Sequence, residues 1–168
     1  KRAIGGHWAL VPKLARMAVE GEIEAYNLPL GRLTQLFRDI AGRRAGTLTR
    51  IGMRTFVDPR QAGGRINDRT HEDLVKLLNI DGDEWLFYKA FPISVALVRG
   101  TTADLSGNIT MEHEALVLDN LALAMAAKNS NGFVIAQVER VCAYGALSAR
   151  QVEIPGVMVD CVITARPE

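Results

Sequence analysis

The sequence has little cysteine, and its two cysteines show no spacing typical of a disulfide framework or a metal site. Cys142 and Cys161 each lie next to a valine, and neither belongs to a Cys-x-x-Cys pair. Isolated cysteines of this kind behave as small apolar core residues, so we expect buried thiols. Because no secretory signal peptide is visible, the expected compartment is the cytoplasm, where thiols stay reduced.

The sequence also lacks an excess of charge of one sign. Lys and Arg number 20 against 19 Asp and Glu, which gives a formal net charge of +1. This balance is not the basic footprint of a nucleic-acid-binding protein, so we expect no nucleic-acid partner.

Long apolar runs are absent as well. The two best candidates, residues 116–127 and 157–165, are interrupted by Asp119, Asn120 and Asp160. They are too polar for a membrane span, and no membrane association is predicted. Hydrophobic residues nevertheless make up 48% of the 168 residues. The composition therefore predicts a single globular domain over residues 1–168 with a well-filled core.

The common nucleotide and hydrolase signatures are missing. No GxGxxG follows a predicted strand, and the sequence contains neither GxxxxGK[ST] nor GxSxG. A dinucleotide site, a P-loop and a serine-hydrolase elbow are therefore not indicated.

Histidine is scarce, with three residues in the chain. His113 lies between two glutamates, but the HExxH motif of a zinc protease would need histidine at the position of Val117. We interpret the segment as an exposed helix N-terminus, where the helix dipole favours acidic residues. His7 and His71 lack metal-spaced partners and are expected to be structural or solvated, so we predict no metal site.

Hydrophobic periodicity predicts alternating strands and helices. The predicted helices cover residues 8–20, 33–40 and 115–128, and the predicted strands cover residues 23–27, 47–53, 77–80, 85–90, 95–98, 109–111, 132–139 and 157–163. Asp81-Gly82 predicts a hairpin turn between two of these strands. The order favours an α/β fold with an open, mostly parallel sheet flanked by helices.

Ligands of such sheets gather at the carboxyl ends of the strands, on the loops. Three segments are expected there: residues 28–31, 55–64 and 100–108. The second is long and contains Asp58-Pro59-Arg60, which is typical of a turn with Asp first and Pro second, or of a functional loop. The residues alone leave both interpretations open.

Five ordered segments of the chain resemble a known family. They are residues 24–31 (EAYNLPLG), 52–64 (GMRTFVDPRQAGG), 87–90 (FYKA), 95–100 (VALVRG) and 103–108 (ADLSGN). Together they are similar to the first half of the family I CoA-transferases, in particular the short-chain acyl enzymes of the acetate, propionate and acetoacetate kind. The resemblance extends from about Gly5 to Ile163.

The resemblance implies an open α/β domain that occurs twice in the complete enzyme, as two domains or two subunits. It also implies transfer of CoA from an acyl-CoA to a free carboxylate through an acyl-glutamyl anhydride and a glutamyl thioester. Coenzyme A would be a substrate, no cofactor would be permanently bound, and the enzyme would be a homo-oligomer. A second CoA-transferase domain or subunit would be the partner.

Two features depart from the family pattern. The nucleophilic glutamate of the family lies in a Gly-rich motif of the second domain, and no such motif occurs here, so we expect no catalytic residue in this chain. Residues 1–168 would then be an incomplete N-terminal domain, inactive alone. In addition, Leu30 stands where many members have a glutamine whose amide can donate a hydrogen bond.

The resemblance also implies candidate substrate-pocket residues on the loops at the strand ends. They are Pro29, Leu30, Gly31, Phe56, Val57, Asp58, Gly63 and Gly64. The glycines would let the backbone approach a ligand closely. Two alternatives stay open: a non-catalytic ligand-binding or assembly module of the same fold, and an acyl-CoA thioester hydrolase.

Overall fold

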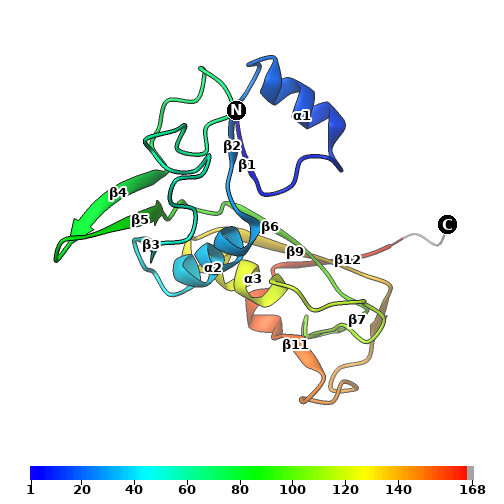
Figure 1. The fold of residues 1–168 in the computed structure, drawn as a ribbon. Coiled ribbons are helices and arrows are strands. Elements are labelled where there is room, and N and C mark those ends of the chain that lie inside the picture. The colour runs from blue at the N-terminus through cyan, green and yellow to red at the C-terminus, as the bar shows by residue number, and fades with distance from the viewer. Residues whose placement is uncertain (166–168) are drawn as a thin grey trace. The chain divides into compact units, whose positions relative to one another are not determined.

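The structure, a computed structural model, describes residues 1–165 of the chain and divides into two compact units (Figure 1). Unit 1 comprises Lys1–Asp39 and Arg44–Ala90, and unit 2 comprises Ile40–Arg43 and the chain from Phe91 onward. Each unit has its own hydrophobic core. The expectation of one domain over residues 1–168 stays a prediction.

Unit 1 contains two helices and five strands. They are β1 (Arg2–Gly5), α1 (Pro12–Val19), β2 (Glu24–Asn27), α2 (Leu30–Ala41, of which residues 30–39 lie in unit 1), β3 (Gly46–Thr49), β4 (Val75–Ile80) and β5 (Asp83–Lys89). The strands form a parallel pair β1–β2 and an antiparallel sheet in the order β3–β5–β4.

The parallel pair β1–β2 ends at Gly5 and Asn27, which lie side by side in the register. Ala25 and Tyr26 of β2 are both fully buried, as expected for a parallel strand covered on both faces. The helix predicted over residues 8–20 begins only at Pro12. Pro favours the first helical position and keeps the residue before it out of the helical region, so Val11 is non-helical.

The predicted hairpin is confirmed: β4 and β5 pair from Val75↔Tyr88 to Ile80↔Asp83. Asp81 and Gly82 both have positive φ, at 53° and 89°, as a two-residue hairpin turn requires. The inner face of the sheet carries Leu86 and Tyr88 into the unit 1 core. The strand predicted over residues 47–53 is shorter than expected, because it ends at Thr49 and turns follow.

Unit 2 contains one α-helix, a 3-10 helix and seven strands within the described residues. They are β6 (Val95–Arg99), β7 (Thr102–Asp104), β8 (Ile109–Thr110), α3 (Asn120–Asn129), β9 (Phe133–Val138), β10 (Arg140–Cys142), β11 (Val152–Ile154), η1 (Gly156–Met158) and β12 (Cys161–Thr164). The run predicted as one strand over residues 157–163 is therefore divided between η1 and β12.

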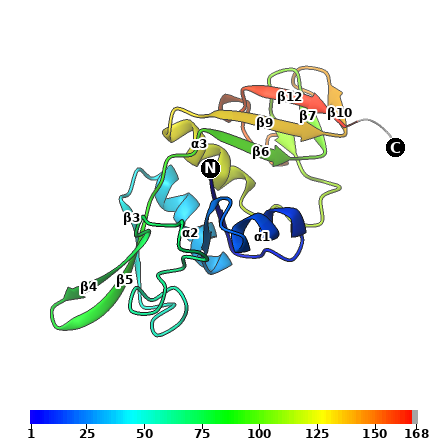
Figure 2. The same cartoon turned by 90° about the horizontal axis from the view of Figure 1, so that it is seen from above.

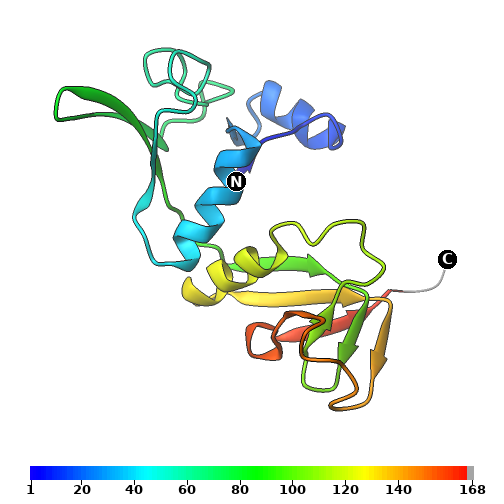
Figure 3. The same cartoon turned by 60° about the horizontal axis from the view of Figure 1, so that its bottom comes forward.

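Three parallel strands in the order β12–β9–β6 form the central sheet of unit 2 (Figure 2). Helix α3 lies against one face of this sheet (Figure 3), where Ala124 and Ala127 pack with Ala96 and Ala136. The strand predicted over residues 95–98 is confirmed as the parallel strand β6. Only its alternate residues are buried, because the helix covers one face of the sheet.

A second sheet of unit 2 has the order β10–β7–β8–β11. Strands β10 and β7 are parallel, and β8 is antiparallel to both of its neighbours. The α/β class with mostly parallel strands flanked by helices is confirmed. The strands divide among four small sheets, and β1, β7, β10 and β11 were not predicted. The last three have three residues each, too few to show a period.

The helix predicted over residues 115–128 begins five residues late, at Asn120. Leu118 has a φ of 52°, which is incompatible with a right-handed helix. The prediction that His113 and its two neighbouring glutamates lie at a helix N-terminus is therefore wrong, since a non-helical segment separates them from α3.

Two further observations concern the chain as a whole. Cys142 and Cys161 are free thiols and only half-buried, so the expectation of buried thiols is wrong. Over residues 1–165, no helix combines the length and the apolar character that a membrane span needs.

Candidate functional site

Two of the expected loop segments meet at the carboxyl end of the parallel pair β1–β2. The Asn27 N–H donates a hydrogen bond to the Gly64 carbonyl at 2.7 Å, and the Leu28 N–H donates one to the Gly5 carbonyl at 2.9 Å. The Gly64 N–H in turn donates to the Phe56 carbonyl at 3.0 Å. Gly64 thus connects the end of β2 with Phe56, while the role of residues 28–31 and 56–64 as a substrate pocket stays a prediction.

Gly64 is required by the close approach of these two segments. Its φ is 79°, and a Cβ atom built there would lie 2.8 Å from the Leu28 Cδ2 atom and 2.9 Å from the Asn27 carbonyl oxygen. Gly63 also has a positive φ, at 62°, but more open surroundings. The close approach that we expected toward a ligand is therefore made, at Gly64, toward the end of β2.

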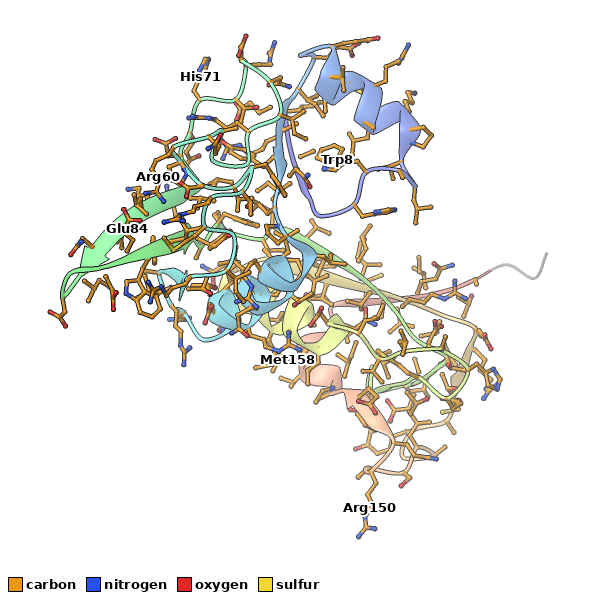
Figure 4. The ribbon with its side chains drawn as sticks, in the orientation of Figure 1. Trp8, Arg60, His71, Glu84, Arg150 and Met158 are labelled. Carbon is orange, nitrogen blue, oxygen red and sulfur yellow. The ribbon has the colours of Figure 1, made fainter. Side chains whose placement is uncertain are left out.

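The Asp58 carboxylate holds the loop together. It is 1% exposed and accepts hydrogen bonds from the Arg54 N–H at 2.8 Å and from the Arg60 N–H and Nε at 3.0 Å. The Arg60 guanidinium also binds Glu84, at 2.9 Å (Figure 4). The hydrogen bonds from Arg60 hold the pKa of Asp58 well below its usual range.

This geometry favours the turn interpretation of Asp58-Pro59-Arg60. The Gln61 N–H donates to the Asp58 carbonyl at 2.8 Å, which closes the turn. The Asp58 carboxylate accepts its hydrogen bonds from Arg54 and Arg60, which precede and follow it closely in the chain. This carboxylate therefore holds the loop in its conformation.

The remaining candidate residues differ in exposure. Val57 is fully buried in the unit 1 core with Leu28, so its side chain does not face an open pocket. Leu30 is 61% exposed and Phe56 is 48% exposed. Pro29 is half-buried, and Gly31 is exposed in the first turn of α2. The exposed part of the candidate site is therefore apolar.

The role of Gly5, the last residue of β1, and of Gly6, which follows it, was not predicted from the sequence. A Cβ atom built on Gly6 would lie 2.9 Å from the Leu30 Cα atom and 3.0 Å from the Leu28 carbonyl oxygen. The Gly5-Gly6 loop is therefore a third element of this edge. Two adjacent glycines after a short alternating run and before a helix were the signal that could have indicated it.

Trp8 follows this loop and packs against Ala18, Ile23 and Ala25, between α1 and the β1–β2 pair (Figure 4). Its indole N–H is the one buried side-chain polar atom without a hydrogen-bond partner among the described residues.

Tyr88, in the unit 1 core with Val57, donates its hydroxyl to the Ile51 carbonyl at 3.0 Å. Burial raises the pKa of Tyr88 to about 12, so it stays protonated near neutral pH.

The third expected segment, residues 100–108, lies in unit 2 and is held by Asp104. This buried carboxylate accepts hydrogen bonds from the Ser106 N–H at 2.9 Å and from the Asn108 N–H at 3.0 Å. The Asn108 amide oxygen accepts the Gly156 N–H at 2.9 Å. A depression of about 410 Å³ lies beside this loop and is lined by Asp104, Ser106, Asp160, Cys161 and their neighbours.

The three acidic and imidazole side chains at residues 112–114 point to different partners. Glu112 accepts a hydrogen bond from Thr102 at 2.6 Å, His113 contacts Glu139 at 2.9 Å, and Glu114 pairs with Arg99 at 3.0 Å. They do not converge. In the part of the chain that the structure describes, no group of three or more His, Cys, Asp or Glu side chains could hold a metal ion.

Comparison with known proteins agrees with this architecture. Residues 1–165 match the family model described as Coenzyme A transferase. The chain is 43% identical to acetate CoA-transferase YdiF of Escherichia coli K12 over 97% of its length. It is 51% identical to caffeate CoA-transferase of Acetobacterium woodii over 82% of its length.

A solved structure, acyl-CoA transferase YdiF of E. coli O157:H7 in a thioester complex with CoA, superposes with a TM-score of 0.95. Its sequence is 42% identical over 97% of this chain, which covers 32% of that structure's chain. The chain likewise spans 31% of the K12 protein and 26% of the A. woodii enzyme, or about a third or less of these relatives. On this evidence, the chain belongs to the coenzyme A transferase family.

Proposed function

We propose that this chain is part of an acyl-CoA:carboxylate CoA-transferase, which moves CoA between a short-chain acyl-CoA and a free carboxylate. The observation that carries the proposal is the junction of residues 28–31 with residues 56–64 through Asn27 and Gly64, in a chain of this family. It places two ordered loops at the carboxyl edge of parallel strands, where α/β folds bind substrates.

The reaction requires a carboxylate nucleophile, which we place on a second domain or subunit. That glutamate attacks the acyl carbonyl and expels CoA as a thiolate, which leaves an acyl-glutamyl anhydride. The CoA thiolate then attacks the glutamyl carbonyl, releases the first carboxylate and forms a glutamyl thioester. The same two steps in reverse transfer CoA to the incoming carboxylate, so coenzyme A is a substrate.

The residues of this chain supply substrate binding in this scheme. Asp58 does not serve as the nucleophile, because Arg54 and Arg60 occupy its carboxylate and its pKa is strongly lowered. Pro29, Leu30, Gly31, Phe56, Gly63 and Gly64 form one wall of the pocket, with Val57 supporting it from the core.

The chain spans about a third of its relatives, which supports a place for residues 1–168 within the N-terminal domain of a two-domain enzyme. We propose a homo-oligomer that assembles around a second CoA-transferase domain or subunit, with no nucleic-acid or membrane partner. The proposed compartment is the cytoplasm, where the free thiols of Cys142 and Cys161 stay reduced.

The test is covalent trapping in the complete enzyme. An acyl-CoA is added without an acceptor, the protein is treated with borohydride or hydroxylamine, and its intact mass is measured. A modified glutamate outside residues 1–168, together with ping-pong exchange kinetics, is expected. If no adduct forms and no CoA exchange occurs, the proposal is wrong and a binding or assembly module is indicated. Release of free CoA without an acceptor would instead identify a thioester hydrolase.

A further inference from the structure

The sheet β3–β5–β4 of unit 1 is apolar on both of its faces. Its inner face carries Leu86 and Tyr88 into the unit 1 core. Side chains alternate between the faces along a strand, and residues paired across two strands share a face. The register therefore assigns the opposite face, called the outer face here, to Leu48, Lys76, Leu78, Ile80, Asp83, Trp85, Phe87 and Lys89. All of them except the two lysines and Asp83 are apolar.

This pattern is unusual for the exposed face of a sheet. An antiparallel sheet with one solvated face normally directs polar side chains to the water. Here Leu48, Leu78 and Ile80 are 43%, 38% and 40% exposed, and Trp85 and Phe87 are half-buried. The β4–β5 hairpin projects from the rest of unit 1 (Figure 1 and Figure 3). An exposed apolar patch that includes aromatic residues is typical of a protein–protein interface.

The outer face also carries charges of both signs. Arg50, the residue after β3, lies over the ring of Trp85, with its guanidinium carbon 5.7 Å from the ring centroid. The same guanidinium lies 3.6 Å from the Asp83 carboxylate, and these two side chains are 56% and 62% exposed. A pair this exposed contributes little within one molecule. Both charges can therefore pair with groups of another molecule.

We propose that the outer face, with Arg50 at its rim, is a docking surface for the same face of a second copy of this chain. The inference rests on the homo-oligomer of the proposed function and names its contact surface. A two-fold axis brings a surface against itself, so the surface must be complementary to itself. The outer face meets this requirement, because Arg50 and Asp83 of one copy can face Asp83 and Arg50 of the other.

The shape of the surface also favours a second copy. Sheets pack face to face with their strands nearly aligned and their side chains interdigitated. A second copy supplies a sheet face with the same twist, the same length and the same apolar positions. Trp85 and Arg50 are of the residue types that contribute most to the stability of interfaces.

The first experiment measures the mass of the complete enzyme by sedimentation velocity. Leu78→Lys combined with Ile80→Lys is expected to reduce the mass to about half, because the new charges of the two copies repel each other across the axis. The control is Leu10→Lys combined with Val19→Lys, which adds the same charge at two apolar residues that are 84% and 76% exposed. The control should keep the wild-type mass. A wild-type mass in the first variant overturns the inference.

Charge reversal then identifies the partner. Asp83→Arg makes the pair of residues 50 and 83 wholly positive, and Arg50→Glu makes it wholly negative. Each variant alone is expected to self-associate about tenfold more weakly than the wild type, and an equimolar mixture of the two is expected to associate again. If both variants associate weakly and the mixture does not recover, the surface binds a different partner, such as the second CoA-transferase domain, and the inference is wrong. Circular dichroism verifies that each variant is folded.

The outcomes separate this inference from the proposed function, because adduct formation and CoA exchange are measured on the same samples. If the wild-type enzyme forms the glutamyl adduct but the outer-face variants keep its mass, the docking surface is wrong and the transferase assignment stands. If the charge-reversed variants recover their association on mixing but the wild-type enzyme forms no adduct, the transferase assignment fails and the docking surface stands.

Discussion

The carboxyl ends of the parallel strands are built differently in the two units. In unit 1, the edge of β1 and β2 is closed by main-chain hydrogen bonds among Gly5, Leu28, Asn27 and Gly64. In unit 2, Glu114 pairs with Arg99 at the carboxyl end of β6, and His113 contacts Glu139 just after β9. Glu112 accepts a hydrogen bond from Thr102 at the start of β7.

The two edges differ in the kind of side chain that they leave exposed. The unit 2 edge satisfies its charged side chains with one another, as in the pair of Arg99 with Glu114 and that of Arg140 with Glu112. The unit 1 edge uses glycines to bring backbones together and leaves Leu30 and Phe56 exposed. At the unit 2 edge, charged side chains are therefore paired with one another. At the unit 1 edge, two apolar side chains, Leu30 and Phe56, stay exposed.

The glycine-based edge can be broken most strongly at Gly64. Gly64→Ala is expected to destabilise unit 1 by about 3 kcal/mol, because the new Cβ atom clashes with Asn27 and Leu28 at a positive φ. Both tryptophans, Trp8 and Trp85, lie in unit 1, so tryptophan fluorescence during urea unfolding reports on this unit.

The matched control for this prediction is Gly82→Ala in the hairpin turn. Gly82 has a similar φ of 89°, but nothing lies within 4 Å of a Cβ atom built there. Gly82→Ala is expected to lower the free energy of unfolding by about 1 kcal/mol, because only the backbone is strained. Equal losses at the two glycines would show that the close approach of the two segments contributes no stability.

The carboxylate that holds the unit 1 loop is the next target. Asp58→Asn is expected to cost about 2 kcal/mol at neutral pH, because Arg60 and the Arg54 N–H lose a buried charged acceptor. The control is Asp81→Asn, at the exposed hairpin turn, which is expected to change stability little.

The pH dependence of this effect has a definite sign. The pKa of Asp58 is lowered on folding by the hydrogen bonds from Arg60. Its stabilising contribution is therefore complete above the unfolded pKa of about 4 and is lost as the pH falls toward the lower folded pKa. The wild-type protein should lose more stability than Asp58→Asn between about pH 4 and pH 2, by urea unfolding followed through tryptophan fluorescence. Parallel pH profiles would contradict this account.

The charged edge of unit 2 is expected to respond less. Burial tends to raise the pKa of Glu112, but hydrogen bonds from Thr102 and Thr110 prevail and lower the pKa to about 2. Its contribution is present above about pH 4 and is lost as the pH falls toward 2. Glu112→Gln is expected to cost about 1 kcal/mol or less, because solvent screens this half-exposed group. Hydrogen exchange of the β7 and β10 amides measures the change, and a loss above that at Gly64 would reverse the comparison.

The smallest effect is expected at the exposed pair of Arg99 with Glu114. Arg99→Gln is expected to cost about 0.5 kcal/mol or less, because the arginine side chain is 65% exposed. Amide exchange in β6 provides the measurement. A much larger loss of stability would mean that the pair of Arg99 with Glu114 holds residues 112–114 in place.

Part of the fold could be predicted from local patterns. The Asp81-Gly82 turn has the backbone requirement of a two-residue hairpin, so β4 and β5 were predicted close to their true positions. The start of α3 could not be predicted. Residues 115–119 have helical periodicity, but Leu118 is held at a positive φ and the helix starts only at Asn120.

The candidate site shows the same division. The sequence indicated residues 28–31 and 56–64 as loops at strand ends, and a chain of hydrogen bonds through Gly64 joins them. It did not indicate that the Gly5-Gly6 loop belongs to the same edge, or that Asp58 is closed off by Arg60. Those facts depend on contacts between residues that are distant along the chain or on the conformation of an irregular loop.

The sequence by itself determined the α/β class, the hairpin, the two loop segments and the resemblance to the CoA-transferases, because these follow from local periodicity, turn chemistry and ordered motifs. Only the tertiary structure decided which side chains face outward at the site. Phe56, Val57 and Asp58 are consecutive in the chain, yet Phe56 is exposed, Val57 is packed in the core, and Asp58 is bound by Arg60. Exposure in an irregular loop follows no period, because packing and hydrogen bonds to other segments set each side chain's direction.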